Sequence, residues 1–458
     1  MIDAQTVARL KQIVGEEVLT AAEDLMLYAY DATLEEYEPE VVIFPREAEQ
    51  IALIMELANA EGIPVVPRGA GTGLSGGSVP LGGGIVLALT RMNRILQIDR
   101  DNLVAVVEPG VVNADFQAAL APLGLFYPPD PASMKACTLG GNVAMNAGGP
   151  RCLKYGVTKD YVLGLEVVLP TGEIIHTGGQ TMKNTTAYDF TRLFVGSEGT
   201  LGVITKMTLR LLPLPEAKRT MLAIFDRLDD ASQAVSSIVA RGIVPTTLEM
   251  LDNLLIQCAE DFVHAGLPRD AAAVLLIEVD GFEEALEGQV ETIRALCRQN
   301  GARQVRVATT LKEVDDLWLA RRTIIGAVAR YRPSMVLDDV TVPRSQLPAM
   351  VSRIVEISER HRLPIGVLAH AGDGNLHPLI LFDQRDEEEL RRVKPIREEI
   401  FAASLELGGV LTGEHGIGLT KRAYLELELG PKEIELTKGI KDLFDPNHIL
   451  NPGKIVGG

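Results

Sequence analysis

A glycine-rich loop, PRGAGTGLSGGSVPLGGG (67–84), constrains the fold of this chain more than any other feature. It follows the apolar run IPVVP (63–67) and contains the spacing GxGxxG from Gly71 onward. A dinucleotide-binding fingerprint of that spacing requires a helix directly after the loop. Here more glycines, a proline and the β-rich run IVLALT follow instead. We therefore reject a Rossmann unit and expect a strand, a loop and a second strand.

The loop nevertheless has the chemistry of an anion-binding site. Successive backbone N–H groups in a glycine-rich turn form a nest that binds anions. Additional hydroxyl donors are present on Thr72, Ser75 and Ser78. A plain strand connection is the alternative, but such a connection rarely needs so much glycine. Two further glycine clusters, at 131–156 and 195–205, indicate that one large ligand is bound along this domain.

Length and charge limit the class of protein. A chain of 458 residues is too long for one hydrophobic core, so two or three domains are expected. Hydrophobic residues make up 47% and charged residues 23%, as in ordinary globular proteins. The formal net charge of −18 disfavours nucleic acid and anionic membranes as primary partners. A small anionic substrate is still compatible with this charge, because a local cationic site can override the average field.

Cysteine usage and the N-terminus bear on the cellular compartment. The four cysteines are scattered, so free thiols in a reducing compartment are predicted and no complete iron–sulfur ligand set is expected. The first residues form an amphipathic pattern that differs from the layout of a signal peptide, and no apolar run reaches the length of a membrane span. We expect a cytoplasmic protein without a direct membrane span, or one attached to a membrane only through a partner.

Hydrophobic periodicity predicts an N-terminal helical part, a β-rich part with the glycine clusters and a second α+β part. From residue 216 onward, two successive β-α-β patterns predict a ferredoxin-like domain, in which we expect parallel pairing within each pattern. The predicted order is strand 220–226, helix 228–242, strand 244–250, strand 274–280, helix 282–300 and strand 304–310. Helices at 311–331 and 345–361, a hairpin at 364–382 and a helix at 386–407 follow. Pro395 lies inside the last helix, where it favours a kink or break.

Two glycine-rich stretches near the C-terminus, AHAGDGNLHP and TGEHGIGLTKR, contain three of the seven histidines. In a hairpin that turns at AGDGN, His370 and His377 lie nearly opposite each other, so their imidazoles converge. Glu414 would complete a His2Glu metal site with positions left for substrate. His415 would point differently and act as a general base. The alternatives are a hydrogen-bonded pair of core histidines and a surface loop around Glu414.

A substrate carboxylate also needs a cationic partner. The helical stretch DDLWLARRTIIGAV places Arg321 and Arg322 after the only tryptophan, Trp318. Arginine binds a carboxylate bidentately, which makes Arg321 and Arg322 the candidates. The alternative for Arg321 is a structural salt bridge.

The order of motifs resembles a known family of flavoproteins. PRGAGTGLSGG after a strand, then TLGGNVAMNAGG, a short segment to YG, and GSEGTLGVIT resemble the FAD-binding domain of the vanillyl-alcohol oxidase superfamily, in its D-lactate dehydrogenase and glycolate oxidase D-subunit branch. The resemblance extends over nearly the whole chain. It implies an α+β fold with a two-subdomain FAD-binding domain, a ferredoxin-like cap and a C-terminal segment that returns to the flavin. The expected domains are an N-terminal helical segment (1–36), the FAD-binding domain (37–215), the cap (216–405) and the C-terminal segment (406–458), with the active site between domains.

The resemblance also implies which residues contact FAD. The pyrophosphate would be held by Arg68, Gly69, Ala70, Gly71, Thr72, Gly73, Ser75, Gly76 and Gly77. The flavin and ribityl chain would be lined by Pro131, Ser133, Thr138, Gly140, Gly141, Asn142, Ala147, Gly148, Tyr155 and Gly156. The adenosine end would be contacted by Glu198, Gly199, Gly202 and Ile204, and the returning tail would contribute Asn451. Some members attach flavin covalently through a histidine in the first loop; that loop has none here, so FAD is expected to be non-covalent.

In metal-dependent members, the pattern HxGDGNxH…EHG supplies two histidine ligands, one glutamate ligand and the catalytic histidine. His370, His377, Glu414 and His415 occupy these positions, and Arg321 occupies that of a substrate-binding arginine. Zinc, iron and manganese all suit such ligands. The implied reaction is oxidation of a 2-hydroxy acid. The substrate's hydroxyl and one carboxylate oxygen bind the metal, His415 takes the hydroxyl proton, and hydride moves from C2 to flavin N5.

Substrate size and electron acceptor follow from the same resemblance. Members that act on 2-hydroxyglutarate have polar groups where this chain has Ile325, Leu337 and Leu379, so D-lactate or glycolate is expected. Electrons would pass to oxygen, a quinone or a separate protein, such as an iron–sulfur subunit or an electron-transferring flavoprotein. Two other interpretations stay open. One is a flavin-dependent transferase resembling alkylglycerone-phosphate synthase, and the other is a non-enzymatic FAD-bearing subunit that relays electrons.

Overall fold

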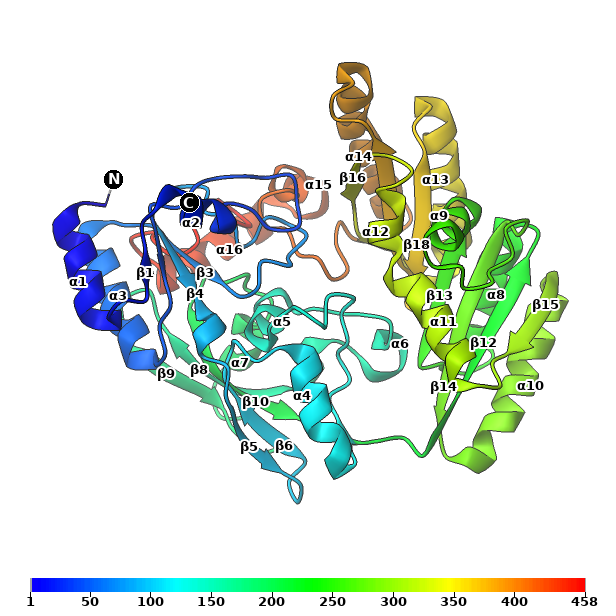
Figure 1. Ribbon diagram of the computed structural model, residues 1–458, viewed down its shortest axis with the longest axis horizontal. Helices are drawn as coiled ribbons and strands as arrows, with labels where there is room; N and C mark the ends of the chain where they lie inside the picture. The colour runs from blue at the N-terminus through cyan, green and yellow to red at the C-terminus, as the bar shows by residue number, and fades with distance from the viewer. Residues whose placement is uncertain (1, 458) are drawn as a thin grey trace. The chain divides into compact units, whose positions relative to one another are not determined.

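The computed structural model describes residues 2–457, and the chain forms two compact units (Figure 1). The first unit consists of residues 2–148, 157–214 and 414–457, and the second of residues 149–156 and 215–413. The chain thus leaves the first unit twice, once for a segment of a few residues and once for the rest of the second unit.

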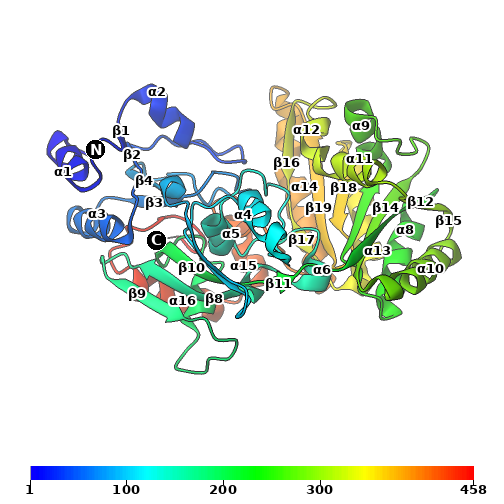
Figure 2. The ribbon, with the colours of Figure 1, turned by 60° about the horizontal axis from the view of Figure 1, so that its bottom comes forward.

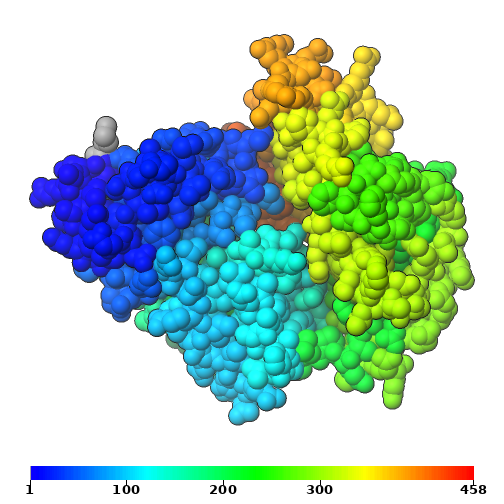
Figure 3. All heavy atoms as spheres, viewed as in Figure 1, coloured from blue at the N-terminus to red at the C-terminus, as the bar shows by residue number. Residues whose placement is uncertain are grey.

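The first unit is built on two separate sheets. A four-stranded sheet has the order β1-β2-β4-β3, and a five-stranded antiparallel sheet has the order β5-β6-β10-β8-β9. The strands are β1 (Val18–Leu19), β2 (Val41–Ile43), β3 (Val65–Arg68), β4 (Ile85–Ala88), β5 (Ile95–Asp99), β6 (Val104–Val107), β8 (Val162–Val168), β9 (Ile174–Gly178) and β10 (Val203–Arg210), with a small pair of β7 (Leu125–Phe126) and β11 (Leu212–Pro213). The helices are α1 (Ala4–Val14), α2 (Ala22–Leu25), α3 (Ala48–Glu61), α4 (Asn113–Leu120), α5 (Leu139–Met145), α7 (Phe190–Phe194), α15 (Leu425–Glu428) and α16 (Pro431–Phe444). In the space-filling view the N-terminal segment covers part of this unit's surface (Figure 3).

The glycine-rich loop alone connects two parallel neighbours, β3 and β4. No helix lies within residues 69–84, so the predicted strand–loop–strand arrangement is confirmed. Helix α3 packs into the core beside these strands through Ile51, Ile54 and Met55, whose spacing places them on one helical face. It ends at Gly62, which adopts the left-handed conformation at φ 65°. This packing holds the sheet from which the loop projects.

The second unit contains one eight-stranded sheet in which every pair is antiparallel (Figure 2). Its order is β15-β12-β14-β13-β18-β19-β16, and β17 also pairs with β19. The strands are β12 (Ala217–Phe225), β13 (Thr247–Asp252), β14 (Ala273–Gly281), β15 (Ala302–Val307), β16 (Ser334–Leu337), β17 (Val340–Thr341), β18 (Ile365–His370) and β19 (Asn375–Phe382). The helices are α6 (Cys152–Tyr155), α8 (Leu228–Ala240), α9 (Asn253–Val263), α10 (Glu283–Gln299), α11 (Leu311–Arg322), α12 (Ile324–Val328), α13 (Leu347–His361) and α14 (Glu387–Glu406).

The ferredoxin-like prediction is confirmed, but the expected parallel pairing is wrong. β12 and β13, which α8 joins, are not neighbours, because β14 lies between them and pairs antiparallel with both. β15 likewise pairs antiparallel with β12 at the edge of the sheet. A helical crossover leaves room for a strand between the two strands that it connects, and the alternation of apolar residues does not reveal which strand fills it. The second strand of the first pattern also begins and ends later than predicted, at Thr247–Asp252.

Helices cover this sheet and close its core. Helices α9, α11 and α12 contribute a cluster of buried apolar residues to one face, together with Leu251 and Leu368 of the strands. Helix α14 runs unbroken through Pro395, so the helix break considered there does not occur.

No helix among residues 2–457 is both long and apolar enough to cross a membrane. Cys137, Cys258 and Cys297 are free thiols, as predicted.

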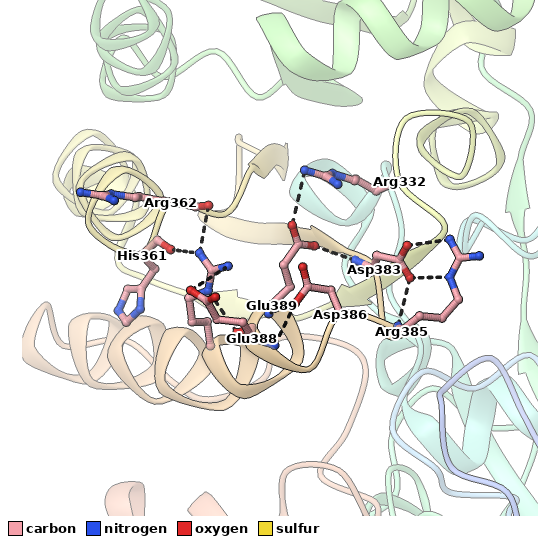
Figure 4. Close-up of polar contacts among 9 residues, drawn as sticks. Arg332, His361, Arg362, Asp383, Arg385, Asp386, Glu388 and Glu389 are labelled. Atoms are coloured by element: carbon pink, nitrogen blue, oxygen red, sulfur yellow. Dashed lines mark hydrogen bonds and ion pairs between the residues drawn. The ribbon is translucent and has the colours of Figure 1, made fainter.

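A network of charged groups fixes the start of α14 (Figure 4). Asp386 caps the helix by accepting hydrogen bonds from two backbone N–H groups of its first turn. Glu389 accepts a hydrogen bond from the backbone of Asp383, just beyond β19, at 2.8 Å. Arg392 donates to the carbonyl oxygen of His361, the last residue of α13, at 2.9 Å. The ends of β19 and α13 are thereby tied to α14, which supports the hairpin formed by β18 and β19.

Candidate active site

The first glycine loop has the donors that a pyrophosphate needs. Among the described residues, the backbone N–H groups of residues 70–78 donate no hydrogen bond to another backbone group. The Ser75 side chain is fully buried, and its hydroxyl has no hydrogen-bond partner within residues 2–457. Close approaches require glycine: a Cβ on Gly69 would lie 2.3 Å from Thr138 Oγ1, and one on Gly71 would lie 2.1 Å from Arg68 Nη2. The loop therefore fits a bound phosphate group.

Arg68 supplies positive charge at the base of this loop. Its side chain is buried, donates weakly to Ser78 at 3.4 Å and lies over the Tyr28 ring, 5.6 Å from the ring centroid. Burial lowers the pKa of the Arg68 guanidinium, and nearby Asp31 partly offsets that effect. A buried guanidinium next to a nest of N–H groups is well suited to an anion.

The second glycine cluster is divided between the two units. Thr138 caps α5 by accepting from Gly141 N at 3.3 Å, and a Cβ on Gly140 would lie 2.4 Å from Pro109 Cβ. The first unit holds Pro131, Ser133, Thr138, Gly140, Gly141, Asn142, Ala147 and Gly148. Tyr155 and Gly156, predicted to continue the same wall, belong to the second unit. There the Tyr155 hydroxyl donates to Asp280 at 2.9 Å.

The third cluster holds the segment that follows His415. The Glu198 carboxylate accepts from the backbone N–H groups of Ile417 at 2.8 Å and Gly418 at 2.7 Å. The Asn451 side-chain amide donates to the carbonyl oxygens of Glu198 and Gly77, each at 2.8 Å. Within the first unit, the glycine loop, the Glu198 turn and the tail therefore meet. The Glu198 carboxylate thus holds the backbone of residues 417 and 418, a role that the sequence did not indicate. The contact of Glu198 with adenosine stays a prediction.

The remaining predicted residues of this cluster lie in the turn before β10 and in β10 itself. A Cβ on Gly202 would lie 2.4 Å from Val167 Cγ1, and Gly199 has φ 66°. Ile204 is buried in β10, opposite Val167 of β8. The first glycine loop also holds the segment that follows His415, because the Ser75 carbonyl oxygen accepts a hydrogen bond from Leu419 N at 2.8 Å.

Stability should depend on pH through Glu198. Burial raises the pKa of Glu198 to about 7, and the N–H groups of Ile417 and Gly418 only partly oppose this. Between its ordinary value of 4.5 and about 7, the folded state therefore holds this proton more tightly than the unfolded state. The contribution of Glu198 to the free energy of unfolding is therefore fully present below pH 4.5 and is lost as the pH rises through 7. Across this range the free energy of unfolding falls by about 3 kcal/mol.

We expect the Tm of FAD-loaded wild type, relative to Glu198→Gln, to fall by about 5 °C between pH 5 and pH 8. Thermal unfolding of both proteins across this range measures it. Because Glu198→Gln has no titrating group at this position, subtracting its Tm from the wild-type Tm removes the effects of the other titrating groups. Parallel Tm profiles would show that Glu198 does not titrate in this range.

The structure brings the three predicted metal ligands together. In the hairpin register His370 pairs with Asn375 and His377 with Leu368, so both histidines project from one face and their rings lie 5.0 Å apart. Both are buried. Their ring nitrogens and a Glu414 carboxylate oxygen all lie within 4.8 Å of one another. Two imidazoles and a carboxylate form a donor set that fits zinc, iron or manganese.

Asp339 fixes the chain immediately before Glu414, and the sequence analysis missed it. Its carboxylate accepts from the Thr412 hydroxyl at 2.6 Å and from Gly413 N at 2.8 Å. Its other oxygen lies 4.0 Å from His377 Nδ1. The acidic pair in VLDDV, between two apolar runs, was the available signal, because acidic residues are rarely buried without a partner.

Arg321 forms a buried salt bridge through one edge of its guanidinium, and its role in binding substrate stays a prediction. It is buried, and its Nε and Nη2 lie 2.7 and 2.6 Å from Glu249 Oε2. Burial works to raise the pKa of Glu249, but attraction to His370 and Arg321 leaves it below its ordinary value, so the group is a carboxylate. Arg322 instead lies over the Trp318 ring, 5.2 Å from the centroid. Glu249 was also missed, although a single glutamate in the apolar strand TTLEMLD was a signal for it.

The three apolar positions considered for substrate size have different environments. Leu337 and Leu379 pair across β16 and β19; Leu379 belongs to the core cluster under α9, α11 and α12, and the partly buried Leu337 packs against it. Ile325 on α12 is 38% exposed. Core packing thus accounts for the apolar side chains at Leu337 and Leu379. Of the three positions, only Ile325 still supports the prediction of a small substrate.

His415 lies between Glu414 and a glycine that cannot be replaced without strain. Gly416 has φ 83°, and a Cβ there would lie 2.7 Å from Glu198 Oε1 and 2.7 Å from Met145 Cε. The chain therefore carries a candidate ligand and a candidate base on consecutive residues, with the backbone after them held by Glu198.

The fold and these loops define a flavin-binding oxidoreductase. The chain belongs to the FAD-linked oxidases of the vanillyl-alcohol oxidase type: the FAD binding domain model matches residues 39–178, and the model for the C-terminal domain of FAD linked oxidases matches residues 214–455. The chain is 49% identical to glycolate oxidase subunit GlcD of Bacillus subtilis, over 94% of this chain and 92% of that protein. It is 36% identical to D-lactate dehydrogenase of Anaerostipes hadrus, over 99% and 98%. The fold matches p-cresol methylhydroxylase at a TM-score of 0.82, with 18% identity over 99% of this chain and 96% of that one.

Proposed function

We propose that this protein oxidises a small 2-hydroxy acid, D-lactate or glycolate, to the 2-keto acid. The observation that carries the proposal is the group of two buried histidines, His370 and His377, with the partly buried Glu414, followed directly in the chain by His415. Relatives named glycolate oxidase subunit and D-lactate dehydrogenase align over nearly the whole chain and support this substrate class.

Each group has a defined task in this reaction. Residues of the loop from Arg68 to Gly77 would hold FAD, which supplies the hydride acceptor when bound. The His370, His377 and Glu414 side chains would hold a divalent cation, which supplies Lewis-acid chemistry at the substrate hydroxyl. His415 accepts the hydroxyl proton on a ring nitrogen. Arg321 orients the substrate carboxylate through the guanidinium edge that Glu249 does not occupy.

We further propose that the electrons leave through a separate acceptor, either a quinone or a partner protein that contains an iron–sulfur centre or a flavin. The scattered cysteines provide no cluster-binding set in this chain. The relative in Bacillus subtilis is named as a subunit, which is consistent with transfer to another chain.

An anaerobic titration tests the proposal. FAD-loaded protein is mixed with glycolate, D-lactate, L-lactate or D-2-hydroxyglutarate while flavin absorbance is followed, and metal content is measured on the same sample. We expect glycolate or D-lactate to bleach the flavin and L-lactate and 2-hydroxyglutarate to do so poorly. If no 2-hydroxy acid bleaches the flavin, the proposed function is wrong, and a preference for 2-hydroxyglutarate overturns the substrate size.

A further inference from the structure

Glu249 contacts two residues that the proposed reaction uses. It lies on β13 opposite His370 of β18 and is completely buried. Its Oε1 is 2.7 Å from His370 Nδ1, and its Oε2 accepts from Nε and Nη2 of Arg321 at 2.7 and 2.6 Å. One carboxylate therefore contacts both a candidate metal ligand and the candidate substrate-binding cation.

The contact with His370 selects one tautomer. A carboxylate only accepts hydrogen bonds, so the proton between Glu249 and His370 is on Nδ1. The lone pair of the neutral ring is then on Nε2, where a metal ligand needs it. The ring is also held in one orientation, because Glu249 and His370 are fixed by cross-strand pairing.

The contact with Arg321 fixes the plane of the guanidinium. Nε and Nη2 are engaged by Glu249, which leaves Nη1 outside the ion pair. A planar guanidinium that is held along one edge presents its other edge in a defined direction, as bidentate recognition of a carboxylate requires.

We propose that Glu249 is a positioning residue that sets both the metal-binding nitrogen of His370 and the orientation of Arg321, so that the metal and the substrate carboxylate are aligned by one side chain. This inference rests on the proposed function and deepens it. Glu249 touches neither substrate nor cofactor in this scheme and acts through the two residues that it holds.

Zinc titrations of metal-stripped, FAD-loaded protein test the His370 contact without turnover. Glutamine at position 249 has one acceptor oxygen and a donating amide, so it cannot serve both partners. We expect the Kd for Zn²⁺ to rise about 10- to 100-fold in Glu249→Gln. The matched control is Glu278→Gln, which alters a buried carboxylate on the adjacent β14 that contacts Trp318 of α11. An unchanged Zn²⁺ affinity in Glu249→Gln, with wild type binding Zn²⁺, overturns the proposal and leaves the proposed function intact.

The double variant Glu249→Leu/Arg321→Met separates orientation from damage to the fold, because leucine offers His370 no hydrogen-bond acceptor. Glu249→Gln leaves a buried guanidinium without its counter-charge, which destabilises the protein, and the methionine removes that charge. We expect thermal stability to recover while Zn²⁺ affinity stays low. If Zn²⁺ affinity recovers as well, the loss came from the buried charge and the role in orienting His370 is wrong.

Pyruvate, the product expected from D-lactate, tests the Arg321 contact. Its binding to zinc-saturated protein is followed by the flavin spectrum, and we expect about tenfold weaker binding in Glu249→Gln than in Glu278→Gln. Equal binding overturns the role in orienting Arg321. If wild type binds neither Zn²⁺ nor pyruvate, the proposed function itself fails, and this inference fails with it.

Discussion

Replacement of His415 by alanine is expected to slow reduction of the flavin by the substrate by about 10²- to 10⁴-fold, the range for loss of a positioned general base. FAD should stay bound, because the contacts that hold the neighbouring backbone come from other residues. The carboxylate of Glu198 and the carbonyl of Ser75 bind the N–H groups of Ile417, Gly418 and Leu419. None of these contacts involves the imidazole.

Anaerobic stopped-flow absorbance measures this effect, and the ratio of flavin to protein absorbance reports FAD content. The matched control is His176→Ala, which removes an exposed histidine on β9 of the same unit. It should reduce its flavin at the wild-type rate. Reduction at the wild-type rate in His415→Ala would instead assign the proton transfer to another group.

The sequence predicted those parts of the site that depend on local geometry. The turn AGDGN determines the register of its hairpin, so the convergence of His370 and His377 followed from spacing alone. The absence of a helix after the first glycine loop followed from the prolines and glycines that come next. In both cases the residues that decide the structure are close together in the chain.

The parts that the sequence did not reveal depend on contacts between distant segments. Glu249 meets Arg321 across a strand and a helix that are 72 residues apart. Glu198 meets Gly418 across 220 residues. Tyr155 lies in a glycine cluster that begins in the first unit, yet its segment belongs to the second unit, where its hydroxyl donates to Asp280. Periodicity and motif spacing carry no information about such pairs. A lone acidic residue in an apolar strand indicates only that some partner exists.

Loss of the divalent cation is expected to have the second large effect. Stripping the protein with a chelator, or replacing His377 by alanine, should reduce substrate-driven flavin reduction at least about 10³-fold, because a Lewis acid contributes several kcal/mol at the substrate hydroxyl. The two ligands that remain in His377→Ala cannot replace the lost nitrogen. The Nδ1 atom of His370 already binds Glu249, and Glu414 is held in place by the anchored Gly413. Two remaining ligands hold a cation poorly.

The chelated wild type and His377→Ala differ in one decisive respect. Added Zn²⁺ or Mn²⁺ should restore flavin reduction in the stripped wild type but not in His377→Ala, in which a ligand is missing. The control is His361→Ala, which removes the histidine at the end of α13 that pairs with Glu399 at 2.8 Å, outside the trio. This variant should keep both its metal and its activity. Full activity in a wild-type sample shown by elemental analysis to be metal-free would mean that His415 and Arg321 activate the substrate without a cation, and that the trio serves only to hold the hairpin.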